Sequence, residues 1–306
     1  MRKLALTVPA GLLLLVLGAC GAGEPGTSQA VAPPASTSAP ARAYAADTLV
    51  LEQRAGPGTG AGGHPEHGPM LCLGGVAQSY PPQCGEVPIT NWDWDAVEGE
   101  EKASGASWGR YHVVGTYDGE TFTVTKVAPY EDHPPTFWSE VDFTSPCQEP
   151  EGGWVAPDSE QALQQHASAA NGYAQRQPDV VTSWVTHIAP DNLDGAVDEF
   201  DPVIFNAVFT GDLERHEAEI RKRWPGPLCV VEGEGPTKRE LNRIRTKAEA
   251  YLTDELGLHM LGSGTGGVEP VIEIGVVADP EGRAQAAVDA RWPGVVRLFP
   301  ALRPVE

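Results

Sequence analysis

The sequence has little positive charge. Its 306 residues include 21 lysines and arginines against 42 aspartates and glutamates, for a net charge of −21. Removal of residues 1–19 would also take away Arg2 and Lys3, leaving 42 acidic against 19 basic residues, a balance of −23. Nucleic acids and anionic lipid headgroups are bound by surfaces rich in lysine and arginine. The composition therefore argues against both as partners.

Long hydrophobic runs are also lacking beyond the first residues, since no later segment approaches the roughly 18 apolar residues of a membrane-spanning helix. The apolar run Leu4–Leu17 follows Arg2 and Lys3; it is too short to span a bilayer but typical of a signal peptide. It ends in Leu17-Gly18-Ala19-Cys20, which resembles the bacterial lipobox. We therefore expect cleavage after residue 19 and lipid on Cys20, which would anchor the protein at the extracytoplasmic face of the cell membrane.

Changes in composition divide the rest of the chain. Residues 20–46 consist mainly of small residues and proline, which cannot bury enough apolar surface to fold, so we predict a disordered tether. Residues 47–144 carry short β-type runs such as Tyr111–Val114, and Asp118-Gly119 marks a hairpin. This pattern predicts a β-rich domain, a small barrel or sheet that resembles an OB-fold. Residues 145–157, rich in Pro, Gly and Glu, are predicted to be a linker.

Residues 158–306 contain a repeated segment. The matching pairs, at one offset of 68 without a gap, are Asp201–Val208 with Glu269–Val276 and Arg223–Gly226 with Arg291–Gly294. Each copy has the pattern of a helix, two strands, a helix and a strand, and the copies cover about 158–233 and 237–302. The chain is therefore predicted to be α+β, with helices packed on one face of an antiparallel or mixed sheet.

The alignment makes predictions about individual residues. Asp212 and Asp279 should cap the second helix of each copy, and Thr237 should form a capping box with Glu240 at the first helix of the second copy. Trp224 and Trp292 should occupy matching positions where a helix leads into a strand, because both belong to the repeated segment Arg-Trp-Pro-Gly.

The core face of one strand is the weak point of the alignment. Asn206 would take the place of Ile274 on that face, where an unpaired buried amide costs about 1–3 kcal/mol, so it would need hydrogen-bond partners. The alternative is that the opposite face, with Phe205 and Ala207, lies in the core. In that case the strand is flipped relative to its counterpart and the ungapped equivalence fails.

The repeated Arg-Trp-Pro-Gly segments and the closing Val295–Leu302 resemble segments of uncharacterised secreted proteins and lipoproteins of actinobacteria, over about the last 150 residues. The low share of lysine relative to arginine and the abundance of Ala, Gly and Pro suit such a high-GC origin. The resemblance implies no activity, because none is known for those proteins.

Four cysteines follow Cys20, and an even number in an exported chain predicts two disulfides with three possible pairings. We expect Cys72 to pair with Cys84, because the segment between them is rich in Gly and Pro and can turn back. Cys147 would then pair with Cys229 and fix the linker to the repeated domain.

Several short motifs suggest chemistry without the context that it needs. Gly105–Gly109 fits G-x-S-x-G and Gly262–Gly267 fits G-x-G-x-x-G, but neither is expected to precede a helix. His64–His67 offers two imidazoles and a carboxylate to zinc or copper, and Asp191–Asp201 offers five carboxylates to Ca²⁺ without EF-hand spacing. His216-Glu217 lacks the second histidine of a zincin. Solvated loops explain these segments, so we assign no metal and no cofactor.

Tryptophan is concentrated in the β-rich region and its linker, at Trp92, Trp94, Trp108, Trp138 and Trp154. Trp92 and Trp94 alternate with acidic residues, as an exposed stacking surface would, although a small β-domain also uses such rings to fill its core. We take Trp92, Trp94 and Trp108 as candidates for a surface that binds a ligand.

These observations predict a non-catalytic, lipid-anchored protein that binds a sugar, a peptide or another protein of the cell envelope. The main alternative is a secreted hydrolase whose catalytic residues come from distant parts of the chain, because such a site is recognised by geometry and not by sequence position. A purely structural or interaction module is the third possibility.

The lipobox generates the first testable prediction. In the producing bacterium the mature protein should begin at a lipidated Cys20, and Cys20→Ser should leave the chain uncleaved or released from the membrane, because serine offers no thiol to the lipid donor. Intact-mass analysis of the purified protein measures this directly. An unmodified Cys20 in the wild-type protein would contradict the prediction.

Overall fold

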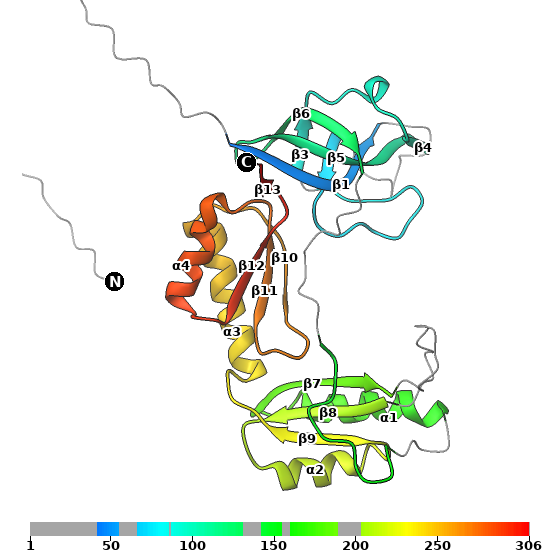
Figure 1. Ribbon diagram of the computed structural model, residues 1–306, viewed down its shortest axis with the longest axis vertical. Coiled ribbons are helices and arrows are strands. Elements are labelled where there is room, and N and C mark those ends of the chain that lie inside the picture. The colour runs from blue at the N-terminus through cyan, green and yellow to red at the C-terminus, as the bar shows by residue number, and fades with distance from the viewer. Residues whose placement is uncertain are drawn as a thin grey trace, which may run out of the picture. The chain divides into compact units, whose positions relative to one another are not determined.

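The computed structural model describes residues 42–54, 66–85, 87–130, 142–154, 160–188 and 203–305 (Figure 1). The chain separates by its contacts into residues 1–40 and residues 41–306, so everything described belongs to the second unit. The fold of this part is α+β, as the sequence predicts. No helix among the described residues is long and apolar enough to cross a membrane.

The described residues form one seven-stranded sheet and two three-stranded sheets. The seven strands are β1 (Ala43–Gln53), β2 (His67–Cys72), β3 (Val87–Thr90), β4 (Glu101–Ala103), β5 (Ala106–Tyr117), β6 (Phe122–Pro129) and β13 (Arg303–Pro304). The other strands are β7 (Val180–His187), β8 (Val203–Phe209) and β9 (Leu228–Glu232) in one sheet, and β10 (Met260–Thr265), β11 (Ile272–Val276) and β12 (Val296–Pro300) in the other. The helices are α1 (Glu160–Ala174), α2 (Leu213–Arg221), α3 (Lys238–Ala250) and α4 (Arg283–Arg291).

The strand pairings of the seven-stranded sheet form a cycle. The order is β13-β1-β2-β3-β6-β5-β4, and β5 pairs with β1 as well. All pairs in the cycle are antiparallel except β3 with β6, which is parallel. The pairing of β1 with β5 runs from Ala43 opposite Thr116 to Gln53 opposite Ala106. Only β4 and β13, both very short, stand outside the cycle, which leaves little strand edge without a neighbour.

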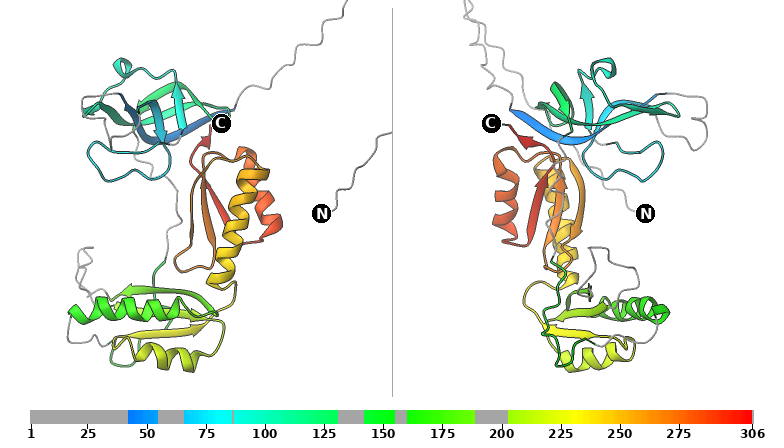
Figure 2. Two further views of the ribbon diagram at one scale, coloured as in Figure 1. Left: turned by 180° about the vertical axis from the view of Figure 1, so that it is seen from behind. Right: turned by 45° about the vertical axis from the view of Figure 1, so that its right-hand side comes forward.

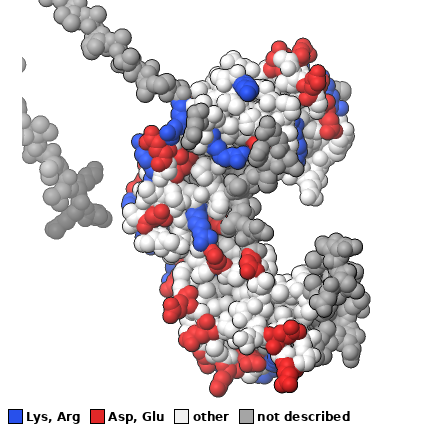
Figure 3. Space-filling view, viewed as in Figure 1, with Lys and Arg blue, Asp and Glu red and all other residues white. Residues whose placement is uncertain are grey.

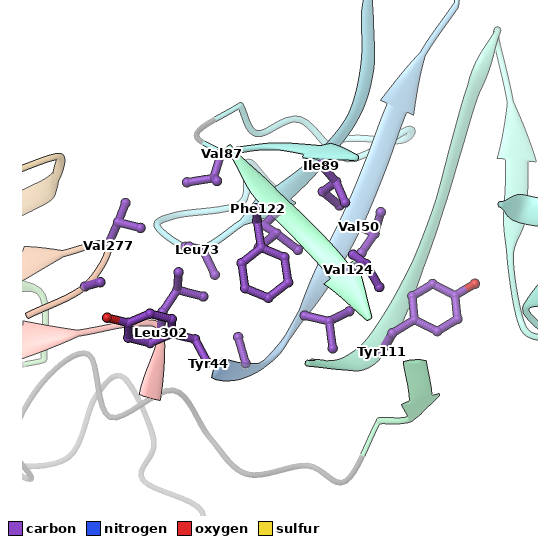
Figure 4. Packing of buried hydrophobic residues seen from close by; sticks show 14 residues of the cluster. Tyr44, Val50, Leu73, Val87, Ile89, Tyr111, Phe122, Val124, Val277 and Leu302 are labelled. Carbon is purple, nitrogen blue, oxygen red and sulfur yellow. The ribbon is translucent and has the colours of Figure 1, made fainter. Parts of the chain in front are cut away.

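The register of β1 and β5 decides which side chains face the core, because residues opposite each other in an antiparallel pair lie on the same face. One face carries apolar residues such as Val50 and Val113 into a buried cluster around Phe122 (Figure 4). Leu302, near the end of the chain, and Val277, directly after β11, join this cluster. The opposite face carries a smaller cluster, consisting of Leu49, Leu51, Cys72, Ala106 and Trp108.

The hairpin between β5 and β6 turns where the sequence predicts it. Gly119 has a φ of +109°, which glycine adopts without strain. The Asp118 carboxylate accepts hydrogen bonds from the backbone N–H groups of Thr121 at 2.7 Å and Glu120 at 2.9 Å. These bonds stabilise the ionised carboxylate and lower the pKa of Asp118.

The two three-stranded sheets have the same order of elements, which the alignment predicts. The first lobe consists of α1, β7, β8, α2 and β9, and the second lobe of α3, β10, β11, α4 and β12. In each, the central strand is antiparallel to the strand before it and parallel to the strand after it. Figure 2 shows α3 and α4 on the same side of the β10–β12 sheet, where they cover its apolar face.

The ungapped alignment of the central strands is wrong. In the first lobe Phe205 faces the helices, whereas in the second lobe Ile272 does, an offset of 272 − 205 = 67. The offset of 68 holds at the helix ends, where the N–H groups of Trp224 and Trp292 bond to residues 220 and 288. A slip of one residue moves every side chain of a strand to its other face. The open alternative, with Phe205 and Ala207 in the core, is therefore the observed one.

Asn206 consequently lies on the face away from the helices, where it is fully buried. Its amide donates to the Thr186 hydroxyl at 2.9 Å and to the Ile204 carbonyl at 3.1 Å, and its oxygen accepts from the Ser145 hydroxyl at 2.7 Å. The indole N–H of Trp184 donates to the carbonyl of Phe143 at 3.2 Å. The segment predicted to be a linker is thus bonded to the sheet of the first lobe, and the buried amide is satisfied.

Both disulfides pair as predicted. The Cα atoms of Cys72 and Cys84 are 5.5 Å apart, and those of Cys147 and Cys229 are 5.8 Å apart. Cys229 lies beside Asn206 in the pairing of β9 with β8. The second disulfide therefore holds the 142–147 segment against the same part of the first lobe that Asn206 binds.

The predicted helix caps are confirmed in part. Thr237 and Glu240 form the capping box, and the Asp279 carboxylate accepts from the N–H groups of residues 284 and 285 at 2.8 and 3.0 Å. Asp212 does not cap α2, because its backbone is left-handed, with a φ of +55°, and its carboxylate binds Arg215 instead.

The β-rich region extends beyond its predicted limits of 47 and 144. β1 already begins at Ala43, within the predicted tether, and β13 adds Arg303 and Pro304 from the end of the chain. The buried carboxylate of Asp47 lies 3.3 Å from the Arg303 guanidinium and 3.0 Å from His112 Nδ1. The contact with Arg303 helps to hold β13 beside β1. The pairing joins residues about as far apart in the sequence as the chain allows, so no local pattern marks it.

The two lobes generate a prediction on stability. Trp224 is fully buried and its indole N–H donates to the Pro227 carbonyl at 2.5 Å, whereas Trp292 is only half-buried. We expect Trp224→Ala to lower the free energy of unfolding by about 3–5 kcal/mol and Trp292→Ala by clearly less. Urea denaturation of the full chain carrying Cys20→Ser measures both. A larger cost for Trp292→Ala would contradict the difference in packing.

Candidate functional site

Trp92 and Trp94, two of the predicted surface residues, pack against the core of the β-rich region. Their ring centroids are 5.3 Å apart, and Trp92 lies 5.1 Å from the ring of Tyr111, both in edge-on arrangements. The indole N–H of Trp94 donates to the buried carboxylate of Glu52 at 2.6 Å, and Arg54 binds the same carboxylate. Both rings are half-buried, so they act chiefly as packing elements.

Trp108, the third candidate, lines a pocket on the outer face of β5. Its ring is 5 % exposed, and the ring of Tyr80 stands edge-on to it with a centroid distance of 5.4 Å. The pocket has a volume of about 470 Å³ and is called here the Trp108 pocket. Its lining residues are Leu49, Val76, Ser79, Tyr80, Pro82, Gly99, Glu101, Trp108, Gly109 and Arg110.

The Cys72–Cys84 disulfide holds the loop that carries Tyr80. The loop turns back through a bridge between Ala77 and Gln83, and the hydroxyl of Ser79 donates to the carbonyl of Pro81 at 2.9 Å. Closing so short a loop contributes on the order of 3 kcal/mol in the chain-entropy model. Tyr80 is 75 % exposed and yet held in place. A ligand that contacts its ring would therefore meet a loop that needs little further ordering.

A second pocket adjoins the first. It has a volume of about 520 Å³, is called here the Tyr130 pocket, and shares Gly99 and Arg110 with the Trp108 pocket. Its other lining residues are Ala96, Val97, Glu98, Tyr111, Val127, Ala128, Pro129 and Tyr130. The guanidinium of Arg110 lies over the Tyr130 ring, 5.5 Å from its centroid. Gly99 and Arg110 line both pockets, and we call the two pockets together the groove.

The hydroxyl of Tyr111 is a polar atom buried at this groove. Tyr111 is 3 % exposed, and its hydroxyl has no hydrogen-bond partner among the described residues. Figure 4 shows it pointing away from Phe122 and the rest of the cluster. Burial, with a smaller effect of the Glu100 charge, raises the pKa of Tyr111, so the group stays a neutral donor. Its oxygen is fully buried, so a ligand in the Tyr130 pocket does not reach it in this conformation.

Gly109 is required by the ring of Tyr111. A Cβ atom at this position would lie 2.4 Å from the Tyr111 hydroxyl oxygen, closer than atoms can approach. Gly105, with a φ of +81°, forms the turn between β4 and β5, and Ser107 lies inside β5. The G-x-S-x-G pattern is thus a hairpin and a strand, with no helix after the serine to make a nucleophile elbow.

The remaining motifs give no site within the described part of the chain. Gly262 to Thr265 belong to β10 and the following glycines to the turn before β11, so no helix follows that pattern. His64, Trp138 and the acidic segment 191–201 lie outside the described residues. His67 bonds through Nδ1 to the carbonyl of Gly68 at 2.8 Å. Where side chains are described, no three His, Cys, Asp or Glu are grouped for a metal ion.

A buried histidine network in the first lobe was not predicted. His216 Nε2 lies 2.8 Å from the Asp179 carboxylate and Nδ1 lies 3.1 Å from the Tyr173 hydroxyl. Its ring stacks on Phe209 with centroids 3.7 Å apart. This arrangement of a histidine between a carboxylate and a hydroxyl resembles a catalytic base with the group that orients it. However, His216 is fully buried and Tyr173 is only 7 % exposed. A substrate cannot reach the imidazole, so the network stabilises the packing of α1 and α2 on the sheet.

Comparison with known proteins identifies no family. No protein-family model matches the chain, and neither does a curated protein or a solved structure. The site therefore rests on geometry. Of the groove residues the sequence predicts only Trp108, and it misses Tyr80, Arg110 and Tyr130, which come from separate segments that the fold brings together.

The unpartnered hydroxyl generates a prediction on stability. Tyr111→Phe should raise the free energy of unfolding by roughly 1 kcal/mol, because it removes a buried hydroxyl that lacks a partner. Tyr117→Phe is the matched control, since the Tyr117 hydroxyl donates to the Gly119 carbonyl at 2.6 Å and its removal should lower stability by about 1 kcal/mol. Urea denaturation midpoints of both variants give the comparison. Equal losses in the two variants would show that the Tyr111 hydroxyl does have a partner.

Proposed function

We propose that the protein is a lipid-anchored component of the bacterial cell envelope that binds carbohydrate in the groove along β5. The lipobox at Cys20 supports the anchor and the extracytoplasmic location, and the resemblance of the last segments supports an actinobacterial origin. The observation that carries the binding proposal is the pair of Trp108 and Tyr80 beside Arg110.

The chemistry of the groove suits a sugar. The C–H face of a sugar ring packs against aromatic rings, and its hydroxyls need polar groups at the edge of the contact. Tyr80 supplies an exposed ring that packs against the largely buried Trp108, and Arg110, Glu101 and Ser79 supply polar groups in the same pocket. Two adjoining pockets of about 470 and 520 Å³ favour an oligosaccharide over a single sugar.

The charge of the groove favours a ligand without strong negative charge. Glu98 and Glu101 line the pockets together with a single cation, Arg110. A polyanion would meet two carboxylates there, and the chain as a whole has a net charge of −21. Neutral glycan fragments of the envelope are therefore the ligands to test first.

We also propose an origin for the two folds. The cycle of β1, β2, β3, β6 and β5, with its parallel pair β3 and β6, supports a small OB-like barrel in the β-rich region. The shared order and pairing of the two lobes support a duplication, followed by a shift of one residue between the central strand and the helix that follows it.

Substitution of the groove residues tests the binding proposal. Trp108→Ala and Tyr80→Ala should each weaken binding of neutral glycan fragments at least about tenfold, because central aromatic contacts dominate such interfaces. Phe143→Ala is the control, an aromatic residue that is 50 % exposed and does not line the groove. Isothermal titration of the full chain carrying Cys20→Ser measures the dissociation constants.

Two results would overturn the proposal. One is the failure of every neutral glycan fragment of the envelope to bind the wild-type protein. The other is binding that Phe143→Ala weakens as much as Trp108→Ala and Tyr80→Ala do. Binding of a peptide in the groove, with no glycan bound, would assign the groove to another ligand class.

A further inference from the structure

A third pocket, which shares no residue with the groove, carries several positive charges although the chain as a whole is strongly acidic. It has a volume of about 630 Å³ and is lined by residues 175–177 directly after α1, the start of β7 and one face of α3. Five of its lining residues are cations, namely Arg176, Lys238, Arg239, Arg243 and Lys247, of the 21 in the whole sequence. We call it the cationic pocket.

Four of the five cations come from α3 alone. Arg239, Arg243 and Lys247 follow one another at four-residue spacing, so they lie on one face of the helix. Lys238 lies on the adjacent row of the same face, with Asn242 and Thr246. Like charges at this spacing repel each other and reduce the stability of a helix. This repulsion weakens the helix slightly, and further negative charge brought to this face would relieve it.

Within the described part of the chain, no ion pair supplies that negative charge, although the charge of Glu240 acts on Arg243 from a greater distance. No described carboxylate lies within 4.0 Å of any of the five cations. Neighbouring basic residues behave differently: Arg245, on the same helix, pairs with Glu249, and Lys222 pairs with Glu219. Ion pairing is thus common on these helices and is missing where the helix lines the pocket.

The surroundings of the pocket suit phosphate groups. Arginine donates two parallel hydrogen bonds to a phosphate, and Asn242 and Thr246 add neutral donors. The cations start at the first turn of α3, the positive end of its helix dipole. Lys238 donates to Gln175, and burial lowers the pKa of its ammonium group, so part of its desolvation has already taken place.

We propose that the cationic pocket binds a molecule carrying two or more phosphate groups. Its volume of about 630 Å³ exceeds the need of a single phosphate ion, and five cations can compensate several negative charges. The net charge of −21 does not exclude such a ligand, because it sums over the whole surface. Figure 3 shows a face on which acidic side chains are more widespread than basic ones, both around α2 and over the β-rich region. Two sources have this chemistry: a soluble polyphosphorylated molecule, or the headgroups of anionic phospholipids.

The experiment uses tripolyphosphate as the soluble probe and vesicles as the membrane probe. The full chain carrying Cys20→Ser is titrated with tripolyphosphate by calorimetry, and is sedimented with vesicles of phosphatidylcholine, with or without phosphatidylglycerol. We expect the double substitution Arg239→Ala and Arg243→Ala to weaken binding at least about tenfold. Arg283→Ala is the matched control, since this exposed arginine of α4 lies outside the pocket.

The folding of the double variant is checked by its urea denaturation midpoint. Removal of like charges from α3 should leave the midpoint unchanged or raise it, so a loss of binding cannot be attributed to unfolding. Arg243→Lys keeps the charge and should retain binding in part, because lysine lacks the planar fork of arginine.

The outcomes distinguish the two ligand sources from each other and show whether the proposal fails. Binding of tripolyphosphate without vesicle binding supports a soluble ligand, and sedimentation only with vesicles that contain phosphatidylglycerol supports lipid headgroups. Absence of both, or equal binding by the double variant and the wild type, overturns the proposal. Neither result bears on the carbohydrate-binding proposal, because the cationic pocket shares no residue with the two pockets of the groove.

Discussion

The pairing of β1 with β5 is the constraint on which the candidate groove depends. Its register places Leu51 opposite Trp108 and Leu49 opposite Arg110, so both groove residues lie on the outer face, while Tyr111 faces inward. A slip of one residue would send Trp108 into the core and Tyr111 to the surface. The apolar cluster around Phe122 opposes such a slip, because it would lose Tyr111 and Val113 of β5 at once.

Two further features fix parts of the β-rich region. The Cys72–Cys84 disulfide keeps the exposed ring of Tyr80 against Trp108, and the return of the chain end as β13 brings Arg303 to the buried carboxylate of Asp47. The β-rich region therefore includes segments from both ends of the described chain.

Local signals in the sequence predicted local structure well, but they did not predict contacts between distant parts of the chain. Neighbouring residues predict the capping box at Thr237, the turn at Gly119 and the Cys72–Cys84 disulfide. The Cys147–Cys229 disulfide then follows by elimination. The core face of β8 could not be predicted in this way, because Val203–Phe209 is apolar on both faces and alternation cannot choose between them. Net charge likewise argued against nucleic acids and anionic lipids as partners, but it could not reveal the cations gathered on one face of α3. The groove itself needed coordinates, since only Trp108 stood out before the fold was known.

Chemical-shift mapping on the nitrogen-15-labelled full chain carrying Cys20→Ser tests the central claim most directly. On titration with neutral glycan fragments of the envelope, the account predicts shifts of the Trp108 indole N–H and of the backbone amides of Tyr80, Gly109 and Arg110, while the amides of α3 stay in place. Shifts confined to the two lobes, or no shifts at saturating glycan, would contradict it.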